Sequence, residues 1–512
     1  MSEHLKRTIP TVLADAATRW GDRLAIEDGS TRLTFAELQG AAQELARACI
    51  SHGLETGQRF AIWAPNSWAW EVAALGGQLA GGVLVPINTR YKGSEAADIL
   101  RRSGSRLLFV TDEFLGQSYP AMLEGESLPD LATQVLLTDD GIRSFAGNAN
   151  TVPDSVVRER ATGIRSDDIA DILYTSGTTG APKGVMVTHG QNIATFMNWS
   201  DAVGLTESDR YLIVNPFFHS FGYKAGWLAA LLRGATSYPA AVFDVPDVLE
   251  RIQRDRISML PGAPTIFQSL LAHPDRHGYD LSSLRCAVTG AASVPVQLVK
   301  DMKHELGFDE VYTAYGLTES TGVVSLCRSG DDFETIANTS GRAMDGVEIQ
   351  ITGAAGEALE AGEAGEVWVR GFNVMKGYLD NPDATADTIT ADGWLKTGDI
   401  GVMDARGYLR ITDRVKDMYI CGGFNCYPAE IEHQLLEHPA IADVAVKGAP
   451  DERMGEVGHA FVVAAPGCEP EEGEIVAWAR ERMANYKAPR RVTVVDALPR
   501  NASGKVQKFL LS

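Results

Sequence analysis

Residues Tyr174 to Gly184 read YTSGTTGAPKG, a polar stretch rich in Gly, Ser and Thr that contains a single lysine, Lys183. Apolar runs flank it, ILY at 172–174 and VMV at 185–187, and predict two strands joined by a flexible loop. Backbone N–H groups of a Gly-rich turn can converge on an anion, and hydroxyl and ammonium groups add further donors. The stretch therefore favours a phosphate-binding loop over a solvent-exposed turn without a ligand.

Other nucleotide-binding and hydrolase motifs do not fit the chain. Pro182 stands where the Walker pattern GxxxxGK[ST] has Gly before its Lys. No GxGxxG follows a predicted strand, so a nicotinamide-cofactor fold is unsupported. No GxSxG is present either, which argues against a serine hydrolase of the α/β type.

Bulk properties narrow the class of protein. A chain of 512 residues is too long to fold around a single hydrophobic core, so two or more domains are expected. Acidic residues outnumber basic ones 67 to 46, giving a net charge of −21, which argues against nucleic acid or an anionic bilayer as the main partner. No stretch has the roughly 20 apolar residues of a membrane span, and the start, MSEHLKRTIP, lacks a signal-peptide core. Six cysteines are few, so we expect reduced thiols and a cytoplasmic protein.

Short β-rich runs alternate with amphipathic segments along most of the chain. This alternation predicts layered α/β architecture with largely parallel sheets in a large N-terminal domain. After about residue 340 short strands dominate and predict a small β-barrel or meander, and from about 415 hairpin, helix and strand signals mix. The charged break at 414–417 divides a domain 1–414 from a small, mobile α+β domain 415–512. The predicted strands are 59–63, 83–87, 106–110, 211–214, 257–260, 284–289, 346–352, 365–371 and 407–412, and the predicted helices include 68–80, 294–306, 428–438 and 471–483.

Several further stretches, in order along the chain, carry a resemblance to a known family. They are YGLTE (315–319), GEVWVRGFNVMKGY (365–378), WLKTGD (394–399), DRVKDMYICGGFNCYPAEIE (413–432) and PRNASGKVQK (499–508). Together with the Gly-rich loop, they resemble the adenylate-forming superfamily of acyl-CoA synthetases, luciferases and peptide-synthetase adenylation domains. LTFAELQGAAQELA (33–46) and GGVLVPINTR (81–90) extend the likeness to nearly the whole chain.

The resemblance implies a complete site for ATP. The loop would hold the β- and γ-phosphates, Tyr315 would stack on adenine, and Thr318 would donate to the α-phosphate. Asp399 would accept from both ribose hydroxyls and Arg414 would reach the same sugar, while Thr178 and Glu319 would hold Mg²⁺, a cation that prefers hard oxygen ligands. The implied ATP and AMP residues are Thr175, Ser176, Gly177, Thr178, Thr179, Gly180, Lys183, Ala291, Tyr315, Gly316, Asp399 and Arg414.

The C-terminal part is implied to complete catalysis. Lys505 would cross the active site and stabilise the charge that builds on the α-phosphate and on the leaving pyrophosphate. Lys416 falls at the family's hinge, and Gly422 and Gly423 would meet pantetheine after domain rotation. Asn425 stands where some relatives carry Arg, so that phosphate contact is not assumed.

The implied reaction activates a carboxylic acid. The acid would form an acyl-adenylate with release of pyrophosphate, and a thiol would then take the acyl group with release of AMP. The stretch VNPFFHSFGYKAG (214–226) contains no Asp or Glu to bind an amino-acid ammonium, so an amino-acid substrate of the peptide-synthetase kind is not expected. Coenzyme A is therefore favoured as the thiol that accepts the acyl group. A carrier protein is the alternative acceptor. A rival to the whole enzyme assignment is an inactive binding paralogue, but every expected catalytic position is filled. A homodimer is a candidate assembly.

An aromatic segment is expected to bind the acid. Phe218, His219, Tyr223, Lys224, Trp227 and Gly290 would contact the acyl group, although such clusters often form plain core instead. His219 is expected to gate or polarise, not to act as a general base. NPFFHSFGYKAG resembles bacterial fatty-acid CoA ligases, most closely those that activate the propanoate side chain of a degraded steroid ring system. Tyr223 or Lys224 could then donate to a ring ketone, and a medium- or long-chain alkyl acid is the competing substrate.

Overall fold

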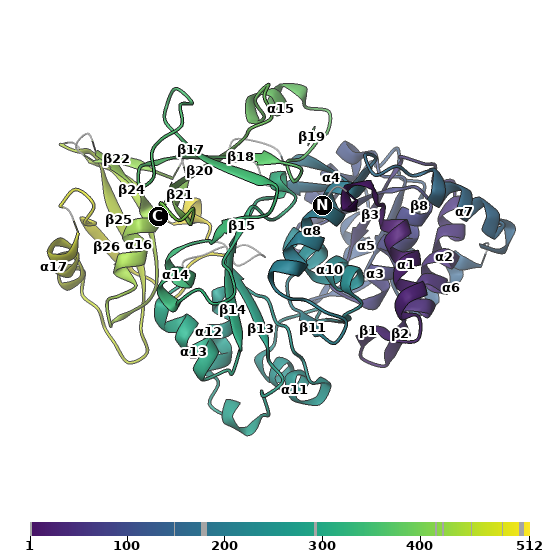
Figure 1. The fold of residues 1–512 in the computed structure, drawn as a ribbon, viewed down its shortest axis with the longest axis horizontal. Coiled ribbons are helices and arrows are strands. Elements are labelled where there is room, and N and C mark those ends of the chain that lie inside the picture. Colours follow the sequence, from purple (N-terminus) through teal and green to yellow (C-terminus); the bar gives the residue numbers. More distant parts are fainter. Residues whose placement is uncertain are drawn as a thin grey trace.

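The computed structural model describes residues 3–147, 149–175, 182–290, 294–414, 417–421, 424–451, 453–483, 485–500 and 506–511 (Figure 1). Its first large sheet is largely parallel, in the order β19-β10-β9-β4-β3-β5-β8. The strands from β9 to β8 are parallel, whereas β10 and β19 add to the β9 edge in antiparallel fashion. The bounds are β3 Arg59–Trp63, β4 Val83–Pro86, β5 Leu107–Val110, β8 Thr133–Leu136, β9 Ile169–Thr175, β10 Lys183–Thr188 and β19 Gly377–Tyr378.

The central strands of this sheet are buried on both faces, which explains their continuous apolar sequence. Every residue of β4 and β5 is buried, and helix α3 (Trp68–Leu79) is buried at almost every position. The prediction of an α/β fold with a large N-terminal and a small C-terminal domain is therefore confirmed. The other helices of the large domain include α1 Ile9–Trp20, α2 Phe35–Ser51, α4 Gly93–Ser103, α7 Asp154–Gly163, α8 His189–Ala202, α11 Val245–Asp255, α12 Pro264–Ala272, α13 Val296–His304 and α15 Pro382–Thr388.

Helix α3 contains a carboxyl group in this apolar layer. Glu71 is 3% exposed and accepts a hydrogen bond from the Ser237 hydroxyl at 2.7 Å. Burial raises the pKa of Glu71 from its ordinary value of 4.5 to about 8, and the nearby Asp28 carboxylate adds to the effect. The side chain is therefore protonated in the folded protein at neutral pH.

Glu71→Gln should remove a pH dependence of stability. Because the unfolded chain releases this proton near pH 4.5 while the folded chain retains it up to about pH 8, the unfolded state binds fewer protons in that window. The wild-type free energy of unfolding therefore falls as pH rises, by about 2 kcal/mol from roughly pH 6 to roughly pH 8. Denaturant titrations should show this fall in the wild type and in a control, Glu44→Gln on the exposed side of α2, but not in Glu71→Gln. An unaltered slope in Glu71→Gln would contradict the assignment.

A second sheet system runs β2-β1-β12-β11 and β13-β14-β15-β16. The segment 257–260 was predicted as a strand between them, but it pairs only through Met259, which bridges Tyr211 on one side and Cys286 on the other. Main-chain bonds flank this bridge, since the Ser258 N–H donates to the Arg210 carbonyl at 3.0 Å and the Leu260 N–H to the Cys286 carbonyl at 3.1 Å, while the Ser258 hydroxyl accepts from the Arg210 N–H. The bounds are β1 Leu24–Asp28, β2 Thr31–Thr34, β11 Arg210–Ile213, β12 Thr236–Pro239, β13 Cys286–Gly290, β14 Glu310–Tyr315, β15 Ser325–Leu326 and β16 Arg342–Ala343.

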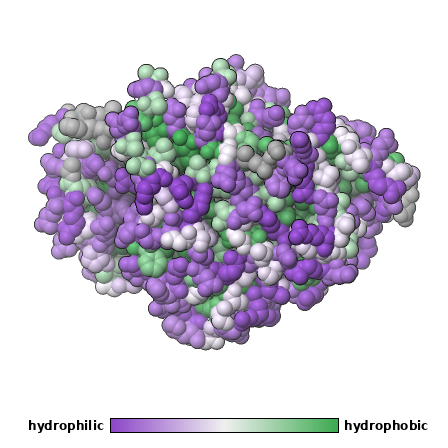
Figure 2. Space-filling view, viewed as in Figure 1, coloured by the Kyte–Doolittle hydropathy of each residue, from purple (hydrophilic) through white to green (hydrophobic). Residues whose placement is uncertain are grey.

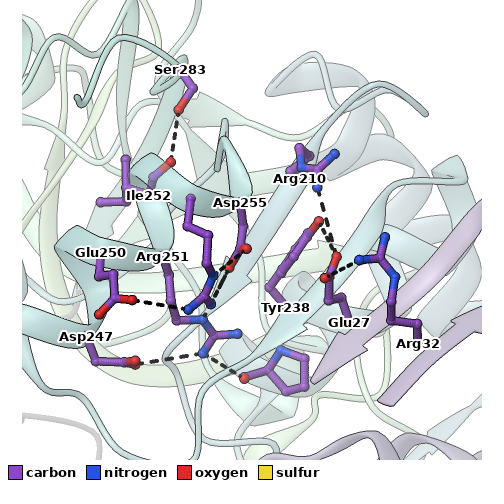
Figure 3. A network of polar contacts seen from close by, with 12 residues as sticks. Glu27, Arg32, Arg210, Tyr238, Asp247, Glu250, Arg251, Ile252, Asp255 and Ser283 are labelled. Carbon is purple, nitrogen blue, oxygen red and sulfur yellow. Dashed lines mark hydrogen bonds and ion pairs between the residues drawn. The ribbon is translucent and has the colours of Figure 1, made fainter. Parts of the chain in front are cut away.

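Polar contacts link β2, β1 and β12 of this system and connect β12 to α11 (Figure 3). Glu27 of β1 accepts from Arg32 at 2.7 Å and from the Tyr238 hydroxyl at 3.1 Å. The Arg251 guanidinium on α11 donates to the Pro239 carbonyl at 3.1 Å. Because Arg32 is largely exposed, we expect these contacts to fix geometry more than to add stability.

The small barrel predicted after residue 340 takes the form of an antiparallel sheet of four strands. Its order is β17-β18-β20-β21, with β17 and β21 at the edges. The bounds are β17 Val347–Thr352, β18 Ala364–Gly371, β20 Leu395–Met403 and β21 Leu409–Arg414.

The C-terminal elements form a separate α+β unit at one end of the molecule (Figure 1). Five strands and two helices surround a hydrophobic cluster of their own that includes Ile431, Val446, Val462 and Ile475. The division at residues 414 and 415 stays a prediction. The bounds are β22 Tyr419–Cys421, β23 Phe424–Cys426, β24 Ile441–Asp451, β25 Gly455–Ala464, β26 Arg491–Val494, α16 Pro428–Leu435 and α17 Glu472–Arg482.

The surface and the thiols agree with the expectations from composition. The face in Figure 2 is mostly hydrophilic, with apolar residues between the polar ones. None of the six cysteines, all within the described ranges, forms a disulfide. Across the described ranges, no helix combines the length and the apolar character that crossing a bilayer requires.

Candidate active site

The predicted phosphate loop connects two paired strands. Thr175 at the end of β9 lies opposite Lys183 at the start of β10, so the two strands are paired up to the residues on either side of the loop. β9 also runs parallel to β4, and ligands of α/β sheets bind at the carboxyl ends of such strands. Thr175 and Lys183 are both half-buried. The loop residues Ser176, Gly177, Thr178, Thr179 and Gly180 lie outside the described residues.

Lys183 contacts a tyrosine to which the sequence analysis assigned no role. Its ammonium nitrogen lies 4.8 Å from the centroid of the Tyr378 ring, a distance at which cations attract aromatic faces. The hydroxyl of the same tyrosine donates to Glu319 Oε1 at 2.9 Å. A predicted phosphate-binding lysine and a predicted metal-binding carboxylate are thus joined through one ring.

The YGLTE turn has a tightly fixed backbone. Thr318 and Glu319 lie in a short 3₁₀ turn directly after β14 and are half-buried. The Glu319 carbonyl accepts from the Met375 N–H at 2.8 Å, so the turn is tied to the segment before β19. A side-chain carbon at Gly316 would come within 2.1 Å of the Gly322 carbonyl oxygen, so only glycine fits there. The backbone thus fixes where Thr318 and Glu319 stand.

Two residues expected to bind the nucleoside lie in direct contact. The Tyr315 hydroxyl donates to Asp399 Oδ2 at 2.6 Å across 84 residues of sequence. Asp399 is 6% exposed, and its carboxylate is placed by β20, where Gly398 has the positive φ of 70° and donates to Glu366 at 3.0 Å. In the register of β20 and β21, Arg414 is the residue opposite Asp399. The structure therefore brings Tyr315, Asp399 and the main chain of Arg414 together.

A buried asparagine holds the start of the segment expected to bind the acid. Asn66 donates to the carbonyls of Ile213 and Asn215 at 3.2 and 2.8 Å, and accepts from the Phe217 N–H at 2.7 Å. His219 follows, and its Nδ1 accepts from the Phe221 N–H at 3.2 Å. This bond places the imidazole proton on Nε2.

The imidazole of His219 stays neutral over the working range of pH. The residue is half-buried, and desolvation lowers its pKa to about 4. A base that weak is poorly suited to general-base catalysis, and the expected gating or polarising role of His219 stays a prediction.

Three residues expected to touch the acyl group lie instead in the core. Tyr223, Lys224 and Trp227 belong to the π-helical turn Tyr223–Leu228 and are 0%, 0% and 1% exposed. Tyr223 and Trp227 stack at 4.9 Å, and both pack against Trp70. Their volume is used to fill the space between α3 and β11, so this placement favours a structural role for these aromatic rings over contact with substrate.

The Lys224 ammonium is paired inside the protein. It lies 2.9 Å from Asp171 Oδ1, and both side chains are fully buried. Asp171 Oδ2 accepts from Asn192 at 2.5 Å, and the Tyr223 hydroxyl lies 3.4 Å from the same oxygen. The hypothesis that Lys224 or Tyr223 donates to a ring ketone therefore finds no support in this geometry.

The remaining predicted positions divide between described and undescribed residues. Phe218 is half-buried beside His219. Gly290 ends β13, where a side-chain carbon would approach the Ala314 carbonyl oxygen to 2.8 Å. Ala291, Lys416, Gly422, Gly423 and Lys505, with the side chains of Arg414 and Asn425, lie outside what the structure describes.

Sequence reasoning missed Tyr378 and Asp171. Tyr378 ends the quoted stretch GEVWVRGFNVMKGY, but nothing local in that stretch indicates that its hydroxyl meets Glu319, 59 residues away. Asp171 precedes the Gly-rich loop within an apolar run, and a charged residue at such a position is itself a signal that a buried partner exists.

Two family models match this chain. The model described as AMP-binding enzyme matches residues 13–379, and the model described as AMP-binding enzyme C-terminal domain matches residues 430–505. The curated relatives include a 3-[(3aS,4S,7aS)-7a-methyl-1,5-dioxo-octahydro-1H-inden-4-yl]propanoyl:CoA ligase of Rhodococcus jostii (strain RHA1). It is 51% identical over 515 residues, which cover 98% of each chain. A protein of the same name from Mycobacterium tuberculosis (strain ATCC 25618 / H37Rv) is 50% identical over 506 residues, again 98% of each chain.

Solved structures share the whole fold. The o-succinylbenzoate coenzyme A synthetase (MenE) of Bacillus subtilis, in complex with ATP and magnesium ion, superposes with a TM-score of 0.84. It is 32% identical in sequence, and the match covers 99% of both chains.

Proposed function

This chain belongs to the AMP-binding enzyme family, and from that premise we propose that it is an ATP-dependent, AMP-forming acyl-CoA ligase. The observation that carries the proposal is the full-length match, at 51% identity over 98% of both chains, to a relative named as a propanoyl:CoA ligase. The geometry supports it, because Tyr378 connects Lys183 with Glu319, and Tyr315, four residues before Glu319, contacts Asp399.

The proposed reaction has two steps. A carboxylate oxygen of the acid attacks the α-phosphorus of ATP, the bond to the β-phosphate oxygen breaks, and pyrophosphate leaves. The sulfur of coenzyme A then attacks the acyl carbon of the adenylate, and AMP leaves with the electron pair of the broken C–O bond. The chain supplies positioning and charge stabilisation and needs no covalent nucleophile.

Each step would use residues that the sequence analysis names. Lys183 and the loop 175–180 would hold the β- and γ-phosphates, Thr318 the α-phosphate, and Asp399 the ribose, with Tyr315 fixing the Asp399 carboxylate. Lys505 would neutralise the charge that develops as pyrophosphate leaves. We propose a division at residues 414 and 415, with the hinge at Lys416 and with Gly422 and Gly423 facing pantetheine in the second step.

The residues present fit a magnesium ion. Glu319 offers a hard carboxylate beside the expected phosphates, and Mg²⁺ binds to one or two carboxylates together with substrate phosphates. Glu319 and Thr178 would hold the ion, which would supply charge neutralisation on the phosphates.

We propose a bulky, ring-bearing propanoic acid as substrate, in keeping with the names of the two actinobacterial relatives. Phe218, His219 and Gly290 would line its site, since Tyr223, Lys224 and Trp227 are engaged in the core. A medium-chain alkyl acid is the competing substrate and a carrier protein the competing acceptor. Six cysteines that form no disulfide suit a cytoplasmic location. A homodimer stays a prediction.

Mass spectrometry of the products tests the proposal. The chain is incubated with ATP and Mg²⁺, with or without coenzyme A, and with a fused-ring keto propanoic acid, an aryl propanoic acid or an alkyl acid of similar volume. We expect AMP and a thioester, formed fastest from the fused-ring acid. Adenylate without thioester would move the acceptor to a carrier protein. A thioester from the alkyl acid alone would overturn the substrate class, and the absence of AMP with every acid would overturn the ligase.

A further inference from the structure

The segment before and within β19 joins two parts of the proposed nucleotide site. On one side its main chain pairs with β10, where Val185 lies opposite Tyr378 and the Leu379 N–H donates to the Gly184 carbonyl at 2.8 Å. On the other side the Met375 N–H donates to the Glu319 carbonyl at 2.8 Å. The exit strand of the phosphate loop and the YGLTE turn are thus held by one short stretch of chain.

Tyr378 repeats this connection with its side chain. It is 7% exposed, its hydroxyl donates to Glu319 Oε1 at 2.9 Å, and its ring lies under the Lys183 ammonium at 4.8 Å. One buried side chain thus contacts both predicted ligand-binding groups.

The ring also separates two opposite charges. Lys183 contacts its face and Glu319 its hydroxyl, so neither charge has to pair with the other. An ammonium and a carboxylate within reach of each other would form an ion pair, and each would then be less available to a phosphate or a metal. An aromatic ring is rigid, which makes it a spacer of fixed length.

We propose that Tyr378 is a positioning residue that orients the Glu319 carboxylate toward the divalent metal and holds the Lys183 ammonium apart from it. The inference rests on the proposed function, because it takes Glu319 as the metal-binding carboxylate. It adds to that function a residue which touches neither reacting atoms nor substrate and acts through its two partners.

Two substitutions separate the two roles. Tyr378→Phe keeps the ring for Lys183 and removes the hydroxyl from Glu319. A hydrogen bond to a charged group contributes enough free energy to change an affinity about tenfold. We therefore expect about a tenfold rise in the Mg²⁺ concentration needed for half-maximal ATP binding. ATP binding without divalent metal should be unchanged. Tyr378→Leu removes the spacer as well, so metal-free ATP binding should also weaken.

The measurement is equilibrium dialysis of ATP against the full chain over a series of MgCl₂ concentrations, with Mn²⁺ binding followed by electron paramagnetic resonance. Tyr408→Phe is the matched control, because it removes a tyrosine hydroxyl that donates to a carboxylate, Asp331, at 2.5 Å outside the site. It should leave the metal dependence of ATP binding at the wild-type value. A wild-type metal dependence in Tyr378→Phe would overturn the inference.

A double substitution distinguishes action through Glu319 from a general loss of structure. If Tyr378 acts through the carboxylate, Tyr378→Phe should add almost nothing to the metal-binding defect of Glu319→Gln. Additive defects would overturn the inference and leave the ligase proposal standing. If the wild type itself bound ATP with no dependence on Mg²⁺ or Mn²⁺, the metal role of Glu319 would fail and this inference with it.

Discussion

Lys505→Gln is expected to slow acyl-adenylate formation by about 100- to 1000-fold, the loss usual when one preorganised donor to developing charge is removed. The reason is electrostatic, since the α-phosphate and the departing pyrophosphate gain negative charge together as the P–O bond breaks. Thioester formation from a supplied adenylate releases AMP without forming pyrophosphate, so the rate of this second step should fall far less than the rate of adenylate formation. Pyrophosphate release and thioester formation are therefore measured separately, the second with synthetic acyl-adenylate.

Lys508→Gln is the control for this prediction. Lys508 stands three residues further along and pairs with Glu432 at 2.7 Å, while Arg500 pairs with Asp443 at 2.5 Å before the lysine-bearing stretch. Partly exposed pairs of this kind contribute about 1 kcal/mol or less. Lys508→Gln should therefore change the rate only a fewfold. An equal loss in both variants would mean that the C-terminal tail was disturbed, and would contradict a specific role for Lys505.

Lys224→Met is expected to lower the free energy of unfolding by about 3–5 kcal/mol, the cost of leaving one member of a buried ion pair without its partner. The carboxylate of Asp171 would stay in the core, where Asn192 and Tyr223 donate to it but carry no compensating charge. Asp171→Asn combined with Lys224→Met removes both charges, so the double variant should recover much of the loss. Denaturant titration of the single and double variants measures both effects.

The same variants decide between a structural lysine and a substrate-binding one. Lys487→Met provides the comparison, because Lys487 pairs with Glu430 at 2.6 Å where both side chains are partly exposed, and it should cost about 1 kcal/mol or less. If Lys224 bound a ring ketone, Lys224→Met would keep its stability and raise the Michaelis constant for keto acids alone. That result would restore the ketone hypothesis and contradict the structural assignment.

Local sequence predicted the frame of the fold well. The run RFAIW at 59–63 coincides with β3, and the predicted helix 68–80 differs from α3 only at its last residue. These segments are long, apolar and bounded by turn residues, so burial and propensity agree. At 257–260 the predicted strand is reduced to a bridge at Met259, although main-chain bonds join the segment to Arg210 on one side and to Cys286 on the other.

Site residues could be predicted where they belong to recognisable motifs. The loop, the YGLTE turn and Asp399 carry recognisable residue patterns, and the structure places Tyr315 against Asp399 as a shared site requires. The acyl segment was harder, because an aromatic residue in a core and one in a pocket have the same sequence signature. Only the packing of Tyr223 and Trp227 on Trp70, and the pairing of Lys224 with Asp171, distinguish the two.

The single-residue bridge at Met259 has a consequence for how such a protein can change during evolution. β11 lies on one side of it and leads into the segment that contains Phe218 and His219, while β13 and β14 lie on the other and lead to Gly290 and Tyr315. Residues expected to contact the acid therefore lie on both sides of this bridge, and main-chain bonds such as the one from Leu260 N–H to the Cys286 carbonyl at 3.1 Å hold the two sides together. Substitutions in 257–260 that shift one side against the other are therefore expected to alter recognition of the acid and of the nucleotide together, so new acids are more easily accepted through changes away from this segment.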